Sequence, residues 1–281
     1  AGYKILMKNN IPNYDYPEDA VSAYHAMYRY HDWIRRPQKT YEQIHVRKEG
    51  VEAIFERARQ ENRARLTDAE VHEVLATYGF RQPRGLFART SEEAVAAAKG
   101  IGYPVVMKIV SPQIVHKSDI GGVKKNLAGK KDVENAFFEI TTHVRNIMPT
   151  ATIYGVLIQE MVPAGKEVII GITNDPQFGH MVMFGLGGIY VEVLKDISFR
   201  VVPLSLEDVH EMVREIKTFP LLRGVRGEAE TDIEAIEKSL LSLSQLATDF
   251  PTIIEADINP LLVQTRGNGV IAIDARFTIG G

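Results

Sequence analysis

The feature that most constrains the fold of this 281-residue sequence is a series of closely spaced strand-like runs. Runs rich in apolar and β-branched residues occupy 152–162, 167–173 and 180–185, with only a few residues between them. Parallel neighbours would need a crossover of about a dozen residues or more, whereas antiparallel neighbours need only a short turn. The spacing therefore predicts antiparallel pairs and a mixed α/β fold of the α+β class, and it disfavours a doubly wound parallel sheet.

Helices with clear start signals alternate with these strands. Thr67 and Thr90 each precede a glutamate three residues later, which is the pattern of a capping box. We expect the two helices that follow to end near Gly79 and near residues 100–102. The other expected elements are strands at 104–110 and 198–204, helices at 132–147, 206–217 and 231–248, and two final strands at 253–263 and 269–275.

The first 66 residues differ in composition from the rest. Residues 17–33 are rich in aromatic residues at helical spacing, which predicts a helix with one apolar face. A basic stretch follows, and we expect residues 34–60 to form a charged, solvated linker that includes a helix. A second interpretation is that residues 1–33 belong to a domain whose body lies elsewhere, because their apolar face needs a partner. The missing initiator Met fits that interpretation.

Composition excludes several classes of function. The sequence has no cysteine, which removes disulfides, thiolate nucleophiles and cysteine-ligated metal sites. Its formal net charge of −3 provides no global basic field for nucleic acid or for an anionic membrane. No apolar run approaches the ~18 residues of a membrane span. We therefore expect a cytoplasmic protein with no nucleic-acid partner and no membrane partner.

Lys108 lies inside the apolar run at 104–110. A lysine in the middle of a buried strand is costly unless its charge meets a partner. Two interpretations are open on the sequence alone. Either the strand is an edge strand and Lys108 extends to water, or Lys108 directs a cation at a phosphate group.

A glycine-bearing basic loop follows at 116–125. Gly121 and Gly122 let backbone N–H groups approach an anion, and the lysines around them add positive charge. His116 carries an imidazole, which is a competent nucleophile for phosphoryl groups, although a lone histidine is more often structural. A P-loop is not expected, because Glu167 stands where a Gly-Lys pair would need Ser or Thr.

Two further segments have the composition of nucleotide-contacting loops. The stretch 159–167 joins two strands and contains Glu160 and Glu167, so backbone and carboxylate groups there can read an adenine edge or ribose hydroxyls. A surface hairpin is the simpler interpretation of that stretch. Gly187 and Gly188 can form a backbone nest for phosphate, but their run lacks the last glycine of a dinucleotide-binding fingerprint.

The last two expected strands are the most informative pair. If they form a hairpin through a loop at 265–268, Asn259 lies opposite Asp274, and Asp257 shares their face. Apolar residues flank all three side chains, so we expect this face to line a groove, with a solvated sheet face as the alternative. Hard oxygen ligands with few carboxylates suit Mg²⁺ that also binds nucleotide phosphates.

Taken in order, the strings at 109–123, 184–204 and 255–262 resemble the ATP-grasp domain of ADP-forming acyl-CoA synthetases (acetate–CoA ligase, ADP-forming), in the succinyl-CoA synthetase superfamily. The resemblance implies an ATP-grasp domain over 61–281, with two α/β subdomains that clasp the nucleotide, preceded by an N-terminal helical extension. Residues 1–33 resemble the end of the CoA-ligase portion that precedes this domain in fused versions of the enzyme.

The resemblance also implies roles for individual residues. Lys108 would contact the nucleotide phosphates, His116 would be the mobile phosphohistidine, and Asp257 would orient a phosphohistidine. Glu160 would read the adenine and Glu167 would hold the ribose. The other implied ATP-site residues are Gln159, Met161, Val162, Gly121, Gly122, Gly187 and Gly188, and the implied Mg²⁺ ligands are Asn259 and Asp274.

The implied function is the reversible conversion of a carboxylate, ATP and CoA to acyl-CoA, ADP and phosphate, through an acyl phosphate and a phosphohistidine. The implied ligands are Mg²⁺ and ATP or ADP. The implied partners are the CoA-ligase (alpha-type) portion of the same enzyme, CoA and a small carboxylic acid, in a hetero-oligomer or a dimer of fused chains. The alternatives are a non-catalytic regulatory ATP-grasp module like that of some protein acetyltransferases, and a carboxylate–amine ligase.

Overall fold

A computed structural model describes residues 2–35, 39–41, 43–114, 117, 120–188, 193–225 and 227–280. The chain divides into two compact units, Ala1–Thr40 and Tyr41–Gly281. Every expected site residue except His116 lies in the described part of the second unit, and His116 lies outside the described residues. No helix in the described ranges is both long enough and apolar enough to cross a bilayer.

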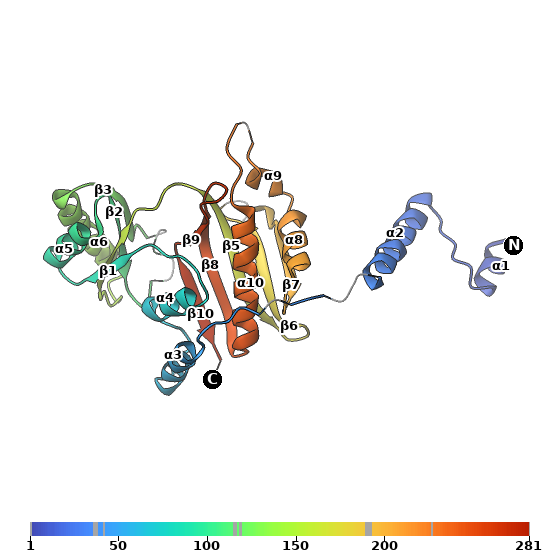
Figure 1. Ribbon diagram of the computed structural model, residues 1–281, viewed down its shortest axis with the longest axis horizontal. Helices are drawn as coiled ribbons and strands as arrows, with labels where there is room; N and C mark the ends of the chain where they lie inside the picture. Colours follow the sequence, from blue (N-terminus) through green and yellow to red (C-terminus); the bar gives the residue numbers. More distant parts are fainter. Residues whose placement is uncertain are drawn as a thin grey trace. The chain divides into compact units, whose positions relative to one another are not determined.

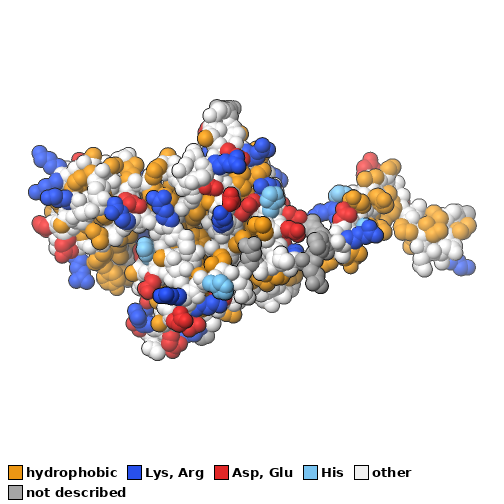
Figure 2. All heavy atoms as spheres, in the orientation of Figure 1, with side chains coloured by type: hydrophobic (Ala, Val, Ile, Leu, Met, Phe, Trp, Pro, Cys, Tyr) orange, Lys and Arg blue, Asp and Glu red, His pale blue; other side chains and the backbone are white. Residues whose placement is uncertain are grey.

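The first unit consists of two helices that bury no side chain. Helix α1 spans Gly2–Lys8 and helix α2 spans Pro17–Ile34 (Figure 1), and neither contains a buried residue. The predicted apolar face of α2 is present, and Tyr24 and Met27 on it are 70% and 68% exposed. Figure 2 shows apolar side chains along this segment. The helix is therefore amphipathic without a covering partner in this chain's first unit.

The second unit contains two antiparallel sheets, as the strand spacing predicted. One sheet has four strands in the order β1-β4-β2-β3. The other has six strands, in the order β10-β8-β5-β6-β7 with β9 paired to β8. The pairings between these strands are antiparallel. The α+β class is confirmed, and each sheet forms the centre of one lobe (Figure 1).

The small lobe, residues 85–160, packs two helices against one face of the four-stranded sheet. Val105, Met107 and Ile109 alternate along β2 and are buried in a core that both helices share. Helix α5 begins at Thr90, whose side chain accepts a hydrogen bond as the N-cap. The elements are β1 (Gly85–Ala88), α5 (Ser91–Ile101), β2 (Val105–Val110), β3 (Val123–Leu127), α6 (Lys130–Ile147) and β4 (Gly155–Glu160).

The large lobe, drawn from residues 43–84 and 161–280, has a separate core. Val168, Ile170 and Ile172 alternate along β5 and pack into that core with residues of α8 and α10. The elements after residue 160 are β5 (Lys166–Asp175), β6 (Gly179–Leu186), β7 (Ile197–Val201), α8 (Leu206–Glu215), α9 (Phe219–Leu222), α10 (Ile233–Asp249), β8 (Ile253–Val263), β9 (Val270–Ala272) and β10 (Ala275–Ile279).

Helix α3 (Glu49–Gln60) packs into the large-lobe core, which differs from the solvated linker expected over 34–60. Val51 and Phe55 are buried, and the Phe55 ring meets the Phe250 ring edge to face at a centroid distance of 4.9 Å. The charged residues of this stretch cover the rest of the helix surface. The high local charge therefore marks the outer face of a packed helix.

Helix α4 (Asp68–Thr77) packs beside α3 and β10 and begins at the predicted capping box. The Thr67 hydroxyl accepts a hydrogen bond from Glu70 N at 3.3 Å, and the Glu70 carboxylate accepts one from Thr67 N at 2.7 Å. Arg63 donates two further hydrogen bonds to the same carboxylate, and this lowers the pKa of Glu70 to about 2. These contacts hold the start of α4, including Asp68, in one position.

The C-terminal hairpin has the predicted register. Leu261 pairs with Ala272 of β9, and further along Ile258 pairs with Ala275 of β10. Between these two pairs, Asn259 N donates to the backbone oxygen of Asp274 at 2.9 Å. The predicted position of Asn259 opposite Asp274 is therefore confirmed.

Candidate functional site

Lys108 is a part-buried cation at the contact between the two lobes. It lies on β2, an interior strand of its sheet, on the face opposite the helix-packed Met107. Its Nζ donates to the backbone oxygen of Ile273 in the large lobe at 3.0 Å. Burial lowers the pKa of Lys108, and the Asp274 carboxylate acts in the opposite direction. The edge-strand interpretation is wrong, because β2 has a neighbour on each side.

Oxygen-bearing side chains of the large lobe lie beside this cation. Asp274 is part-buried, and its Oδ1 accepts a hydrogen bond from Ala275 N at 3.1 Å. Asn259 lies opposite Asp274 and is exposed. Asp257 precedes Asn259 by two residues, so the two share one face of β8, and Asp257 pairs across the strands with Arg276.

These oxygen donors fit a metal ion that is shared with a ligand. Among the described residues, no group of three or more His, Cys, Asp or Glu side chains could hold a metal ion. Mg²⁺ prefers oxygen donors and commonly uses one or two carboxylates together with substrate phosphates and waters. Asp274 and Asn259 supply a donor set of that size and chemistry.

The connection from β4 to β5 passes from the small lobe to the large lobe. The buried side chain of Gln264 donates from Nε2 to the backbone oxygen of Pro163 at 3.3 Å, which ties this connection to the large lobe. Met161 is exposed and Val162 is part-buried. Glu167, near the start of β5, is exposed.

The Glu160 carboxylate already has a charged partner. Arg84 Nε donates to Glu160 Oε2 at 3.1 Å, and Glu160 N donates to the backbone oxygen of Arg84 at 2.9 Å. Arg84 also donates from Nη2 to the backbone oxygen of Ile101 at 3.1 Å. The carboxylate expected at the adenine is thus engaged by an arginine 76 residues earlier in the chain, which no local motif indicates.

Lys117, the residue after His116, forms an ion pair with the large lobe. His116 itself lies outside the described residues. Lys117 Nζ donates to Asp68 Oδ2 at 2.9 Å, and the Lys117 side chain is 12% exposed. Asp68 is the first residue of α4, so this ion pair joins the two lobes. Sequence reasoning missed it, because 49 residues separate the partners.

Two of the glycines expected to cradle phosphate use their N–H groups within the chain. Gly122 N donates to the backbone oxygen of Lys117, and Gly187 N donates to that of Glu167, both at 2.7 Å. A Cβ at Gly122 would lie 2.7 Å from that Lys117 oxygen, so a larger residue does not fit. In this conformation Gly122 and Gly187 therefore serve close backbone packing.

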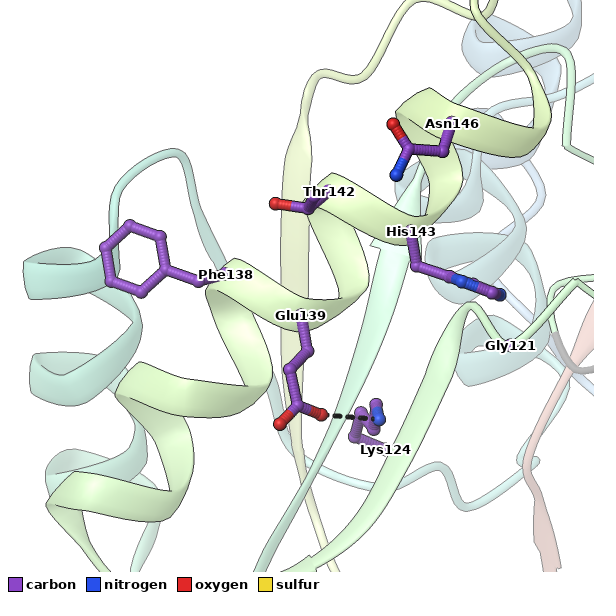
Figure 3. A pocket seen from close by; sticks show the side chains of 7 residues that line it. All are labelled: Gly121, Lys124, Phe138, Glu139, Thr142, His143 and Asn146. Atoms are coloured by element: carbon purple, nitrogen blue, oxygen red, sulfur yellow. Dashed lines mark hydrogen bonds and ion pairs between the residues drawn. The ribbon is translucent and has the colours of Figure 1, made fainter.

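Gly121 lies at the rim of a hollow of about 600 Å³ beside α6 (Figure 3). The His143 ring extends toward it, and a Cβ at Gly121 would lie 3.1 Å from His143 Nε2. Lys124 Nζ donates to Glu139 Oε2 at 2.7 Å in the same hollow. Lys124 pairs with Met107 across β2 and β3, so it lies on the helix-covered side of the sheet, away from Lys108.

Residues 57–279 match the family model described as ATP-grasp domain. The acetate–CoA ligase (ADP-forming) I of Archaeoglobus fulgidus is 47% identical over 280 residues, which are 99% of this chain and 40% of that protein. The 4-hydroxybutyrate–CoA ligase (ADP-forming) of Nitrosopumilus maritimus is 45% identical over 274 residues, which are 98% of this chain and 39% of that protein. This chain thus spans about two-fifths of the length of these relatives.

A separate subunit and a solved structure match over nearly their whole length. The acetate–CoA ligase (ADP-forming) I subunit beta of Pyrococcus furiosus is 50% identical over 226 residues, 80% of this chain and 96% of that subunit. A structure of acetyl-coenzyme A synthetase 1 from Ca. Korarchaeum cryptofilum, with coenzyme A and Ca-AMPCP, has a TM-score of 0.77 and 43% identity over 81% of this chain and 98% of its own.

A second structure of the Korarchaeum synthetase bears on the ligands. It has a TM-score of 0.71 and 40% identity, and it covers 82% of this chain and 99% of its own. It contains coenzyme A and Mg-AMPPCP, and its phosphohistidine segment points towards the nucleotide binding site. The resemblance that the sequence motifs indicated is confirmed, together with the expected fold.

Proposed function

Because this chain belongs to the ATP-grasp domain family, we propose that it forms the nucleotide-binding part of an ADP-forming acyl-CoA synthetase. The whole enzyme would convert a carboxylate, ATP and CoA reversibly to acyl-CoA, ADP and phosphate. Relatives at 45–50% identity are ADP-forming CoA ligases, which are acid–thiol ligases. None of the relatives named above is a regulatory module, so the comparisons favour catalysis.

One arrangement carries this proposal: a cation and a set of oxygen donors meet where the two lobes touch. Lys108 comes from the small lobe, and Asp274 and Asn259 come from the large lobe. Phosphoryl transfer depends on positioning and charge neutralisation more than on covalent machinery of the protein. Facing surfaces with these charges supply both requirements for a nucleoside triphosphate.

We assign Asn259 and Asp274 as the residues that would hold Mg²⁺. Their oxygens are hard donors, and their small number leaves positions for phosphate and water oxygens. When bound, Mg²⁺ neutralises charge on the transferred phosphate groups. Lys108 would bind phosphate oxygens from the opposite lobe, where partial burial protects its charge from screening by water.

We assign His116 as the carrier of the phosphoryl group. One imidazole nitrogen would form a bond to the γ-phosphorus of ATP as the bond from that phosphorus to the bridging oxygen of ADP breaks. Asp257 would orient the ring by accepting a hydrogen bond from the other nitrogen. Transfer of the phosphoryl group to a carboxylate oxygen gives an acyl phosphate, from which the CoA thiolate displaces phosphate. The Mg-AMPPCP structure of the Korarchaeum synthetase supports this route.

The carboxylate and CoA steps require a second part, which we propose is a CoA-ligase (alpha-type) portion. Relatives include a separate beta subunit and longer chains that contain this region. We also propose that residues 1–33 end such a portion, because the longer relatives align over 98–99% of this chain and the separate subunit over 80%. The complete enzyme would then be a hetero-oligomer or a dimer of fused chains.

The test is direct labelling of the histidine. The 281-residue chain is incubated with γ-labelled ATP and Mg²⁺, and the protein is assayed for label that is acid-labile and base-stable. We expect label on the wild-type chain and none on His116→Ala. The matched control is His210→Ala on α8, which should keep the label. Unlabelled wild-type protein, or label that persists in His116→Ala, would contradict the phosphohistidine route.

A further inference from the structure

One buried side-chain polar atom in the described part of the chain has no hydrogen-bond partner: Gln159 Oε1. Gln159 is the penultimate residue of β4, beside the connection to the large lobe, and it is only 9% exposed. Buried polar atoms are nearly always paired, because an unpaired acceptor away from water costs free energy. The unpaired Gln159 oxygen is therefore well suited to accept a hydrogen bond from a ligand.

Gln159 lies on the same sheet face as Lys108. Gln159 pairs with Val106 of β2, and Leu157 pairs with Lys108. Cross-strand partners project from the same side of a sheet, as do residues two apart on one strand, so these four side chains share one face. We call it the inter-lobe face, because Lys108 on it reaches the backbone oxygen of Ile273 in the large lobe.

On the side of β4 away from β2, the cross-strand neighbour of Gln159 is a glycine. Gly85 of β1 pairs with Gln159, and a Cβ at Gly85 would lie 3.2 Å from Gln159 Cγ. The Gln159 side chain thus occupies the space above the edge strand that a side chain at residue 85 would need. Its stem is packed between β1 and Val106, and this packing limits where the amide group can lie.

Glu160 has the opposite properties and does not fit the adenine role expected for its carboxylate. It pairs with Val105, whose side chain is in the helix-packed core, so Glu160 projects from the other side of the sheet. Its carboxylate accepts a hydrogen bond from Arg84. Of these two adjacent side chains, only Gln159 combines a buried unpaired acceptor with a place on the inter-lobe face.

We propose that Gln159 is the residue that reads position 6 of the purine base, an inference that rests on the proposed nucleotide function. Adenine presents an amino group at this position, and hypoxanthine and guanine present a carbonyl oxygen. As the structure places it, the amide oxygen of Gln159 accepts from a 6-amino group. The amide must turn over within its packed position before it can donate to a 6-oxo group, so the wild-type chain should favour ADP over IDP. Glutamate at residue 159 would only accept, and methionine would do neither.

The test compares Mg-ADP with Mg-IDP, which differ at position 6, by calorimetry at pH 8. Gln159→Glu should raise the ratio of ADP to IDP affinity about tenfold over wild type, because an ionised carboxylate cannot donate to the 6-oxo group. Gln159→Met should weaken ADP binding about tenfold and bring the ratio toward one. The two variants thus move the ratio in opposite directions.

Two controls separate base recognition from damage to the fold. Inorganic tripolyphosphate has no base, so both Gln159 variants should bind it as wild type does. Gln60→Met, at an exposed position of α3 that bonds Glu56, should leave the ADP to IDP ratio unchanged.

Three results would overturn the assignment. The first is an unchanged ratio in both Gln159 variants with normal tripolyphosphate binding. The second is a ratio that shifts in Glu160→Gln and in neither Gln159 variant. The third is a wild-type chain that binds tripolyphosphate but neither nucleotide, and this result would also remove the proposed function.

Discussion

The two lobes of the second unit present different chemistry to each other. The small lobe offers a cation and an amide, Lys108 and Gln159, from the interior of its sheet. The large lobe offers carboxylate and amide oxygens, Asp257, Asn259 and Asp274, from its C-terminal hairpin. Each lobe has its own apolar core, so each can maintain its surface independently. The candidate site is therefore a property of the contact between the two lobes.

Removing the cation of the small lobe should have the largest effect. Lys108→Met should weaken Mg-ADP binding about 100-fold, because charge-assisted hydrogen bonds to phosphate are lost. The melting temperature should stay the same or rise, because a part-buried ammonium group is replaced by an apolar side chain. Calorimetry and thermal melting measure the two effects. Unchanged affinity would show that the phosphates do not bind at the lobe contact.

Removing a charge from the large lobe should have a smaller and metal-dependent effect. Asp274→Asn should weaken Mg-ADP binding about tenfold and leave metal-free ADP binding nearly unchanged, because one hard oxygen ligand is weakened. Calorimetry with and without Mg²⁺ distinguishes the two. Asp175→Asn is the matched control, because Asp175 accepts hydrogen bonds from Gln177 N and Phe178 N within a turn. Equal losses with and without the metal would contradict the assignment of Asp274.

Breaking the ion pair that joins the lobes should slow phosphorylation of the chain about two- to fivefold. This factor corresponds to the free energy that one exposed ion pair contributes. Asp68→Asn removes the partner of Lys117, and the double exchange Asp68→Lys with Lys117→Asp should restore part of the rate. The initial rate of labelling by γ-labelled ATP is the measurement. Glu139→Gln breaks the Lys124 pair on the helix side of the small lobe and should leave the rate unchanged.

The smallest effect should be an acid-dependent change confined to the large lobe. The pKa of Glu70 is lowered to about 2 by its hydrogen bonds from Arg63, against an ordinary value of 4.5. Its contribution to stability is therefore complete above about pH 4.5 and is lost as the pH falls through about 2. Glu70→Gln should lower the melting temperature by about 2–4 °C at pH 7, with the difference shrinking toward pH 2. A constant difference over that range would exclude the ionised carboxylate as the cause.

Local signals were sufficient for most of the fold and for the position of Asn259 opposite Asp274. Thr67 and Glu70 mark the start of a helix because their hydrogen bonds are local. The position of Asn259 opposite Asp274 was predictable because a short loop sets the register of the strands that flank it. The family resemblance rests on the order of the motifs along the chain, and the matching relatives confirm that resemblance.

Contacts between distant segments were not predictable in the same way. Alternation shows which side chains share a face, but not which distant residue covers that face. The Arg84–Glu160 and Asp68–Lys117 pairs join residues 76 and 49 positions apart, so no spacing rule indicates them. The same reason explains why the sequence of helix α3 predicts a solvated linker. The charged residues of α3 are evident in the local sequence, whereas its core partner Phe250 lies far along the chain.

Hydrogen exchange in helix α2 can be used to follow the binding of a partner. Amide hydrogens in a helix with no buried side chain are protected only by the helix itself, and short isolated helices open readily in water. Deuterium should therefore enter residues 17–34 quickly in the chain alone, while the buried strands of the second unit exchange slowly. A partner that covers Tyr24 and Met27 would slow amide exchange in α2. The fall in the exchange rate of that helix would therefore show when the partner binds.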